Sequence, residues 1–272
     1  MKIIGHRGGS FGSPENTMAA FHMALNLGAD GFECDIQELA DGNLIILHDT
    51  NLWRTSGAQW YWIFFWPLTT IRLLRSAQKL RLKDVLNVDV GSWFDKRFAK
   101  ERIPTFAQVA SLAKEANSHC FAELKTPCTS NLVHSAVQAV KNVPVNTITW
   151  ISFDLDLLLQ IKKLDSQRKV LYIVQVQNSE NAMKAAKTCI DAGLDGLDLN
   201  AETYAVTPDL VKFLHDNNKL VAVWVYSAPA ADNDTEEMRK YMEDIGVDFF
   251  TSNLPPLLTE LPPDLGQESN TI

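Results

Sequence analysis

Strand-like and helix-like segments alternate along most of this chain, and this alternation constrains the fold more than any other feature. Hydrophobic and β-branched runs predict eight strands, at Lys2–His6, Gly31–Ile36, Phe121–Lys125, Thr147–Phe153, Lys169–Gln175, Asp195–Asn200, Leu220–Tyr226 and Asp248–Ser252. Stretches with a helical period separate most of them, at Asn131–Lys141, Leu155–Leu164, Ser179–Ala192, Pro208–Asn217 and Glu236–Ile245. Alternating strands and helices indicate a parallel sheet. The strand spacing fits the units of a closed barrel, with an open sheet as the alternative.

The size and composition of the chain suit one large globular domain. Its 272 residues are 46% hydrophobic, which is enough for a large core. The net charge of −8 argues against general nucleic-acid binding. The first strand is predicted directly after Met1, so we expect no leader segment. The four cysteines lack the spacing of a zinc site, so we expect a cytoplasmic protein with reduced thiols.

The segment from Asp30 to Thr50 carries the residues with the clearest chemistry. Alternation along its first half places Glu33 and Asp35 on one face of a strand. Asp41-Gly42 predicts a two-residue hairpin turn, because glycine tolerates positive φ. Counting back from that turn puts His48 opposite Asp35, although a bulge would break this register. The equally acceptable interpretation of this segment by itself is the polar outer face of an ordinary hairpin.

The two acidic side chains of this face imply a cation. Two carboxylates within a few ångströms of each other repel, and one stays protonated unless a cation lies between them. Oxygen ligands without a thiolate favour a hard ion over zinc. A site that contains Glu33 and Asp35 therefore predicts a divalent cation, Mg²⁺ or Ca²⁺, as the cofactor.

The N-terminal segment adds an imidazole and a guanidinium at the end of a strand. His6 and Arg7 close the first predicted strand, and they offer an acid–base group and a fork that pairs with phosphate. Ser13-Pro14 predicts the start of a helix, with Ser13 as its N-cap, and the helix should continue to about Leu27.

Several short motifs resemble the glycerophosphodiester phosphodiesterase family in their order and spacing. They read HRG, PENT, AF, GAD, ExD, DG and HD within the first fifty residues, and a Glu-Leu-Lys strand follows at Glu123–Lys125. The resemblance covers most of the chain. It implies a (β/α)8 TIM barrel with a hairpin after the second strand and a small insertion before the third. It also implies a bound divalent cation and hydrolysis of glycerophosphodiesters to glycerol 3-phosphate and an alcohol.

The resemblance implies a role for each matching residue. These residues are Glu33, Asp35 and Glu123 for metal ligation, His6 and His48 for acid–base catalysis, and Arg7 and Lys125 for phosphate contact. Trp224 matches a family tryptophan near the glycerol end of the substrate, with packing inside the barrel as the alternative. Two departures concern the far half of the barrel mouth. Ser252 stands where the family usually has Asp, and Val-Tyr-Ser follows Trp224 where a polar pair ending in Asn is more usual.

A reaction follows from these roles. The cation and Arg7 would neutralise the non-bridging phosphate oxygens and stabilise the charge of the transition state. By analogy with related barrel phosphodiesterases, His6 would be the base and His48 the acid. The nucleophile is either water or the glycerol 2-hydroxyl of the substrate. Two alternatives use the same residues: lysophospholipase D-type hydrolysis at a membrane surface, and a phosphodiester- or membrane-binding barrel without turnover.

The insertion at residues 51–104 is the most individual part of the chain. Between Asn51 and Lys83 it is rich in aromatic and basic residues and contains no acidic residue. The apolar run from Trp60 to Leu74 is shorter than the roughly 20 residues of a membrane-spanning helix. Peripheral membrane contact through residues 53–83 is one interpretation, and burial against the barrel or in a dimer is the equally supported alternative.

A helix after Pro67 would carry basic and apolar residues on opposite sides. The two sets are Arg72, Arg75 and Lys79 on one side and Leu73, Ala77 and Leu80 on the other. We expect one barrel domain over residues 1–260, which includes this insertion, and a loosely held tail at 261–272. The expected partner is a small-molecule glycerophosphodiester.

Overall fold

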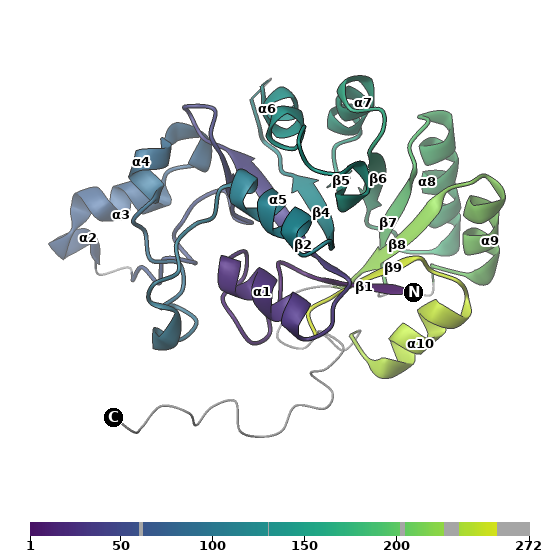
Figure 1. Ribbon diagram of the computed structural model, residues 1–272, viewed down its shortest axis with the longest axis horizontal. Helices are drawn as coiled ribbons and strands as arrows, with labels where there is room; N and C mark the ends of the chain where they lie inside the picture. Colours follow the sequence, from purple (N-terminus) through teal and green to yellow (C-terminus); the bar gives the residue numbers. More distant parts are fainter. Residues whose placement is uncertain (60–61, 130, 202–204, 226–233, 255–272) are drawn as a thin grey trace.

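The computed structural model describes residues 1–59, 62–129, 131–201, 205–225 and 234–254. These residues contain a sheet whose eight parallel strand pairs close a barrel (Figure 1). The barrel strands are β1 (Lys2–Gly5), β2 (Gly31–Glu38), β4 (His119–Leu124), β5 (Ile148–Ser152), β6 (Lys169–Val174), β7 (Gly196–Asn200), β8 (Leu220–Trp224) and β9 (Phe249–Ser252). Pairing of β1 with both β2 and β9 closes the ring. The predicted (β/α)8 barrel is therefore confirmed, and the open sheet is excluded.

Helices lie outside the barrel and connect its strands (Figure 1). They are α1 (Met18–Asn26), α5 (Phe106–Glu115), α6 (Leu132–Ala139), α7 (Leu155–Leu164), α8 (Ser179–Asp191), α9 (Pro208–Asp216) and α10 (Glu236–Asp244). Most begin at a polar side chain that accepts a backbone N–H of the first turn, as Asp154 does for α7 and Thr207 for α9. Their apolar faces pack on the outward side chains of the strands, which form the main core.

The inward side chains of the strands form a separate apolar plug. It consists of Ile4, Phe121, Ile151, Leu171, Ile173 and Ala222. Because side chains alternate along a strand, Glu123 shares the inner face of β4 with Phe121 and lies nearer the carboxyl end. The plug therefore forms a floor, and the acidic residues of the neighbouring strands lie above it.

The hairpin after β2 has a different register from the predicted one. β3 (Leu44–Ile46) pairs antiparallel with β2 so that Leu47, not His48, donates its backbone N–H to the carbonyl oxygen of Asp35, at 2.8 Å. The two-residue turn was wrong because the loop has three residues, the last of which is Gly42 with a φ of 78°. Since a shift of one residue reverses the side-chain faces, His48 does not face Asp35 across the hairpin.

The first helix also begins later than predicted. Thr17, rather than Ser13, is the N-cap, and its side chain accepts the backbone N–H of Ala20. The Ser13 hydroxyl instead donates to the Gly9 carbonyl oxygen at 2.8 Å, in a turn that precedes the helix. Asn16 in this turn has a left-handed φ of 57°, which a continuous helix would not allow. The turn extends the chain toward the barrel mouth before α1 begins.

The insertion folds as an arm with a small core that includes Leu39, Ile45 and Leu47 of the β2–β3 hairpin. Its elements are α2 (Trp62–Phe65), α3 (Pro67–Leu74), the 3₁₀ helix η1 (Ala77–Lys79), α4 (Leu82–Val85) and the 3₁₀ helix η2 (Lys96–Phe98). Leu73, Ala77 and Leu80 are buried, as the sequence predicts. One continuous helix over them was wrong, since α3 ends at Leu74 and the backbone of Arg75 is extended.

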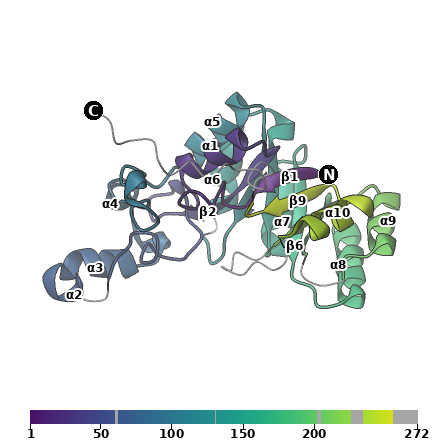
Figure 2. The same cartoon turned by 90° about the horizontal axis from the view of Figure 1, so that it is seen from below.

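The aromatic residues of the arm differ in their surroundings. Trp53 packs partly against the core of the arm, whereas Phe64, Phe65 and Trp66 are exposed. Trp60 and the side chain of Trp62 lie outside the described residues. Figures 1 and 2 both place α2 and α3 at one extremity of the molecule. The described helices include none that is long and apolar enough to cross a bilayer.

Gly31 is a position where the barrel leaves no room for a side chain. A Cβ at Gly31 would lie 2.1 Å from the carbonyl oxygen of His119 on the neighbouring strand. We therefore expect Gly31→Ala to lower the free energy of unfolding by about 1–3 kcal/mol, measured by urea denaturation. At Gly12 the nearest atom is the flexible Met23 Sδ, so Gly12→Ala is the matched control and should change stability far less. Equal losses in both variants would contradict this account of Gly31.

Candidate active site

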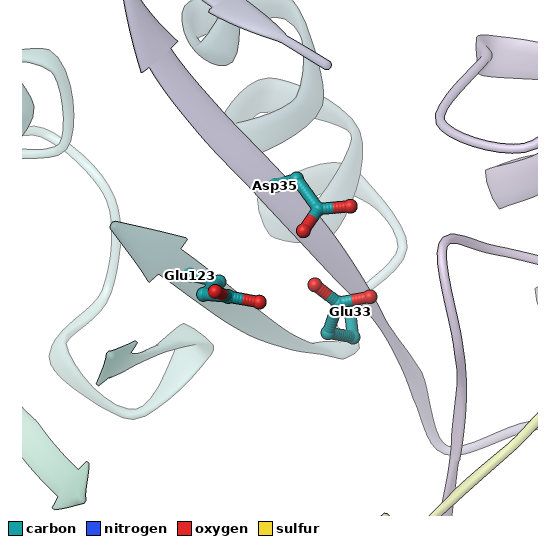
Figure 3. Close-up of side chains that lie close together, drawn as sticks. All are labelled: Glu33, Asp35 and Glu123. Atoms are coloured by element: carbon teal, nitrogen blue, oxygen red, sulfur yellow. The ribbon is translucent and has the colours of Figure 1, made fainter. Parts of the chain in front are cut away.

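Three carboxylates from two neighbouring strands meet inside the barrel mouth. Glu33 and Asp35 lie on β2, Glu123 lies on β4, and Asp35 pairs with Glu123 in the register of the two strands. One oxygen of each side chain lies within 4.8 Å of the others (Figure 3). All three residues are buried. The structure thus brings together the three residues that the family resemblance implies as metal ligands.

The three carboxyl groups are not equivalent electrostatically. Burial and the charge of Asp35 raise the pKa of Glu123 to about 7, and the same two causes raise the pKa of Glu33 well above its ordinary value. Burial opposes ionisation of Asp35 too, but Lys125 and Arg7 lower its pKa below the ordinary value. Repulsion among buried carboxylates is thus only partly balanced by the protein's own cations.

The donor set fits a hard divalent cation. Oε1 of Glu33 is buried and has no hydrogen-bond partner among the described residues. Such an atom costs free energy unless it gains a ligand. Three carboxylates that converge without a thiolate or an imidazole suit Mg²⁺ or Ca²⁺ better than zinc.

Arg7 and Lys125 lie against the carboxylates. The Lys125 ammonium lies 2.9 Å from Glu123 Oε1 and 3.2 Å from Asp35 Oδ1. Arg7 Nε lies 3.5 Å from Asp35 Oδ2, and the backbone N–H of Arg7 donates to Glu33 Oε2 at 2.9 Å. Both cations therefore flank the place where an anionic substrate would meet the carboxylates.

His6 is held with one ring nitrogen directed at the carboxylates. Its Nδ1 lies 2.8 Å from Asn253 Oδ1, so Nδ1–H donates to that amide oxygen. Its Nε2 lies 4.0 Å from Glu33 Oε2. Burial and the charge of Arg7 lower the pKa of His6 to about 4, so the ring is neutral at pH 7 and Nε2 is able to accept a proton.

His48 is oriented by its sequence neighbour. Its Nδ1 lies 2.9 Å from Asp49 Oδ1, and because a carboxylate only accepts, Nδ1 is the donor. The hydrogen bond from His48 and the charge of Arg54 lower the pKa of Asp49. Glu15 accepts from Arg54 at 2.7 Å and from Arg7 at 3.0 Å. A row of alternating acidic and basic side chains thus connects the arm to the barrel mouth.

The sequence predicted no role for the carboxylates of Glu15 and Asp49. Glu15 and Asp49 belong to the PENT and HD motifs, so the motifs themselves held the signal. Arg54 had no such signal, because its contacts cross 39 residues of sequence to reach Glu15. Only the fold of the arm brings these two residues together.

One cavity of about 320 Å³ connects the predicted residues. Its lining includes His6, Arg7, Glu33, His48, Glu123, Lys125 and Trp224. Asp35 contacts two of these residues, Lys125 and Arg7. Trp224 meets Phe153 edge to face, with ring centroids 6.1 Å apart. The cavity is therefore lined by both charged and aromatic side chains, as a polar ligand with an organic group requires.

Asp198 lines the cavity as well, and the sequence analysis did not single it out. It is buried on β7, and its Oδ1 has no hydrogen-bond partner in the described part of the chain. Burial and the charge of Glu123 raise its pKa to about 8. Its signal in the sequence was its position between Leu197 and Leu199, since both leucines pack outward and alternation directs Asp198 inward.

The departure at Ser252 has a local counterpart. The carboxylate of Asp234 accepts the Ser252 hydroxyl at 2.8 Å and the backbone N–H of Asn253 at 2.8 Å. Arg239 donates to the same carboxylate at 2.6 Å. An acidic group thus lies beside the end of β9 although it comes from a different segment. The other departure, after Trp224, falls partly on Tyr226 and Ser227, outside the described residues.

Comparison with known proteins gives a consistent result. The model of the "Glycerophosphoryl diester phosphodiesterase family" matches residues 6–256. A glycerophosphodiester phosphodiesterase of Caldanaerobacter subterraneus is 27% identical, over 95% of this chain and 96% of its own. A phosphodiesterase of Oleispira antarctica, solved with the product sn-glycerol-3-phosphate, has a TM-score of 0.74 at 22% identity and covers 94% of each chain. A Thermotoga maritima glycerophosphodiester phosphodiesterase has a TM-score of 0.69 at 18% identity, covering 96% of this chain and 98% of that one.

The raised pKa of Asp198 predicts a pH-dependent loss of stability. Its pKa in the fold, about 8, lies above the value of about 3.9 in an unfolded chain. Between these values the folded state holds a proton that the unfolded state has lost, so stability falls as pH rises, by at most about 1.4 kcal/mol per pH unit. Asp198→Asn removes this dependence, so its free energy of unfolding should increase relative to that of the wild type as pH rises from 5 to 8.

Urea unfolding of both proteins in EDTA, at several pH values across this range, measures the effect. The matched control is Asp156→Asn, because Asp156 is exposed on α7. A difference between Asp198→Asn and the wild type that stays constant with pH would contradict the prediction.

Proposed function

This chain is an enzyme that belongs to the glycerophosphoryl diester phosphodiesterase family, and we propose that it hydrolyses glycerophosphodiesters to glycerol 3-phosphate and an alcohol. The observation that carries the proposal is the convergence of Glu33, Asp35 and Glu123 beside two histidines in one cavity. The alternatives, a lysophospholipase D-type enzyme and a barrel without turnover, are not favoured, since the names of the relatives refer to glycerophosphodiesters.

In this proposal Glu33, Asp35 and Glu123 hold a divalent cation, Mg²⁺ or Ca²⁺. When bound, it supplies positive charge to the phosphate oxygens at the point where negative charge develops. Arg7 and Lys125 add to that charge from the protein. Both already flank the carboxylates at 2.9 to 3.5 Å, so contact with a phosphate needs only a small shift of their ends. An arginine is suited to two parallel hydrogen bonds with a phosphate, and a lysine acts as a point charge.

The two histidines take different roles in the proposal. His6 is the general base, because a ring with a lowered pKa is neutral at pH 7 and its Nε2 accepts the proton of the attacking hydroxyl. The nucleophile is water or the glycerol 2-hydroxyl of the substrate. His48 is the general acid, and its Nε2 gives a proton to the leaving alkoxide. Asp49 supports that role because its carboxylate accepts from Nδ1–H and so fixes the orientation of the ring.

The aromatic side chains of the cavity would receive the organic part of the substrate. Trp224 and Phe153 present ring surface there, and we assign Trp224 to the glycerol end. Asp198 and Thr251 each bury an oxygen without a hydrogen-bond partner among the described residues, so hydroxyl groups of a bound substrate would satisfy them. The proposed location is the cytoplasm, where the four free cysteines stay reduced.

The metal assignment is tested by Glu33→Gln. Loss of this negative ligand should weaken Mg²⁺ or Ca²⁺ binding, measured by calorimetry, and abolish most turnover of glycerophosphocholine while the circular dichroism spectrum stays unchanged. Glu237→Gln is the matched control, since Glu237 is exposed on α10 and its loss should change neither binding nor turnover. If wild-type enzyme keeps full activity after EDTA treatment, the metal assignment is wrong.

The histidine roles are tested by His6→Ala and His48→Ala. Each should lower kcat on glycerophosphocholine by at least about a hundredfold, the usual contribution of general acid–base catalysis. A p-nitrophenyl diester has a leaving group that needs no protonation, so it should partly rescue His48→Ala and not His6→Ala. His134→Ala, at an exposed position of α6, should behave like the wild type. Equal rescue of His6→Ala and His48→Ala would remove the basis for separate roles.

A further inference from the structure

The arm carries a concentration of exposed apolar side chains. Of the eleven large hydrophobic residues that are exposed in the described part of the chain, six lie between residues 64 and 74. They are Phe64, Phe65, Trp66, Leu68, Ile71 and Leu74, which we call the apolar ridge. Leu68 is 83% exposed, Phe64 73% and Phe65 70%. A monomeric soluble protein rarely leaves such a cluster in water unless it contacts something.

The ridge is held on a fixed framework. The opposite side of α3 is buried through Thr70 and Leu73, which face the core of the arm. The Leu73 carbonyl accepts the Leu52 backbone N–H at 3.1 Å, and the Thr50 carbonyl accepts the Ala77 backbone N–H at 2.9 Å. These bonds at the carboxyl end of α3, together with the buried Thr70 and Leu73, fix which face turns outward. Exposure of the ridge therefore follows from the packing of the arm.

Exposed basic residues lie within and directly after the ridge in the sequence of an otherwise acidic protein. Arg72, Arg75, Lys79, Arg81 and Lys83 are all exposed. Residues 51–83 contain no aspartate or glutamate, whereas the whole chain carries a net charge of −8. The surface that matches this segment is therefore both anionic and able to accept apolar side chains. Mixed aromatic and basic residues of this kind are typical of the water–bilayer boundary.

We propose that the apolar ridge and its basic neighbours form a docking surface for an anionic lipid bilayer. The ridge would enter the headgroup region while the arginines and lysines pair with lipid phosphates, each of them contributing attraction that decays within a Debye length. A second copy of this chain fits less well, because two such surfaces would bring their positive charges together. Figures 1 and 2 support access, since α2 and α3 lie at an extremity of the molecule.

Docking does not depend on turnover, so this inference goes beyond the proposed hydrolysis. Few contacts separate the site from the ridge. Asp49 holds His48, and Thr50 fixes η1 next to α3. A bilayer bound at the ridge would therefore contact the arm, which begins directly after the catalytic candidate His48.

The test is co-sedimentation of the full chain with vesicles of phosphatidylcholine, with or without phosphatidylglycerol. At about 0.05 M NaCl the wild type should pellet with the anionic vesicles only, and at about 0.5 M NaCl binding should fall. Phe65→Ser combined with Leu68→Ser should weaken binding at least about tenfold, as should Arg72→Glu combined with Arg75→Glu. These residues are exposed, so circular dichroism and turnover of a soluble diester should not change.

Leu164→Ser is the matched control, since Leu164 is 53% exposed at the end of α7 and lies outside the ridge. It should bind vesicles as the wild type does. A wild type that stays in the supernatant at low salt would overturn the proposal, and so would double variants that bind unchanged. Sedimentation velocity is the second readout. A wild-type dimer that the Phe65→Ser and Leu68→Ser variant dissociates would assign the ridge to a second copy and also overturn it.

Discussion

The repulsion among three buried carboxylates is the interaction on which the rest of the site depends. Glu33, Asp35 and Glu123 meet in the barrel mouth because β2 and β4 are paired in parallel register. Lys125 and Arg7 stabilise the charge of Asp35, while Glu33 and Glu123 keep raised pKa values. The protein thus gathers more carboxyl groups in one place than its own cations keep ionised, and a further cation would favour the ionised forms of Glu33 and Glu123.

The barrel and the arm both serve this arrangement. The apolar plug closes the barrel below the carboxylates, so that the site opens only toward the cavity. The arm contributes Arg54, which holds Glu15 against Arg7 and Asp49 against His48. Loss of this single guanidinium would leave Glu15 with Arg7 and Asp49 with His48, so each carboxylate would lose one of its partners. A segment that looks like an independent insertion is therefore coupled to the geometry of both the phosphate-binding and the acid–base candidates.

Local patterns in the sequence predicted the barrel and the position of several residues at its mouth, whose catalytic and binding roles stay predictions. Alternating side chains placed Glu33 and Asp35 inward, and the motif spacing placed His6 and Arg7 at the end of β1. The predicted hairpin register was wrong because the loop has three residues, with Gly42 as the third. The sequence alone does not distinguish this loop from the predicted two-residue turn. His48 nevertheless reaches the cavity, since the chain leaves the hairpin before it. Arg54 and Asp234 were beyond prediction, because their partners are distant in sequence.

The central claim is that the three carboxylates form one cation site. An anomalous-difference map from crystals soaked in Mn²⁺, a redox-stable stand-in for Mg²⁺ in an oxygen site, tests it most directly. The account predicts one strong peak within coordination distance of Glu33, Asp35 and Glu123, with the Lys125 ammonium moved away from Glu123. A map without a peak there, or with Lys125 still between the carboxylates, would contradict it.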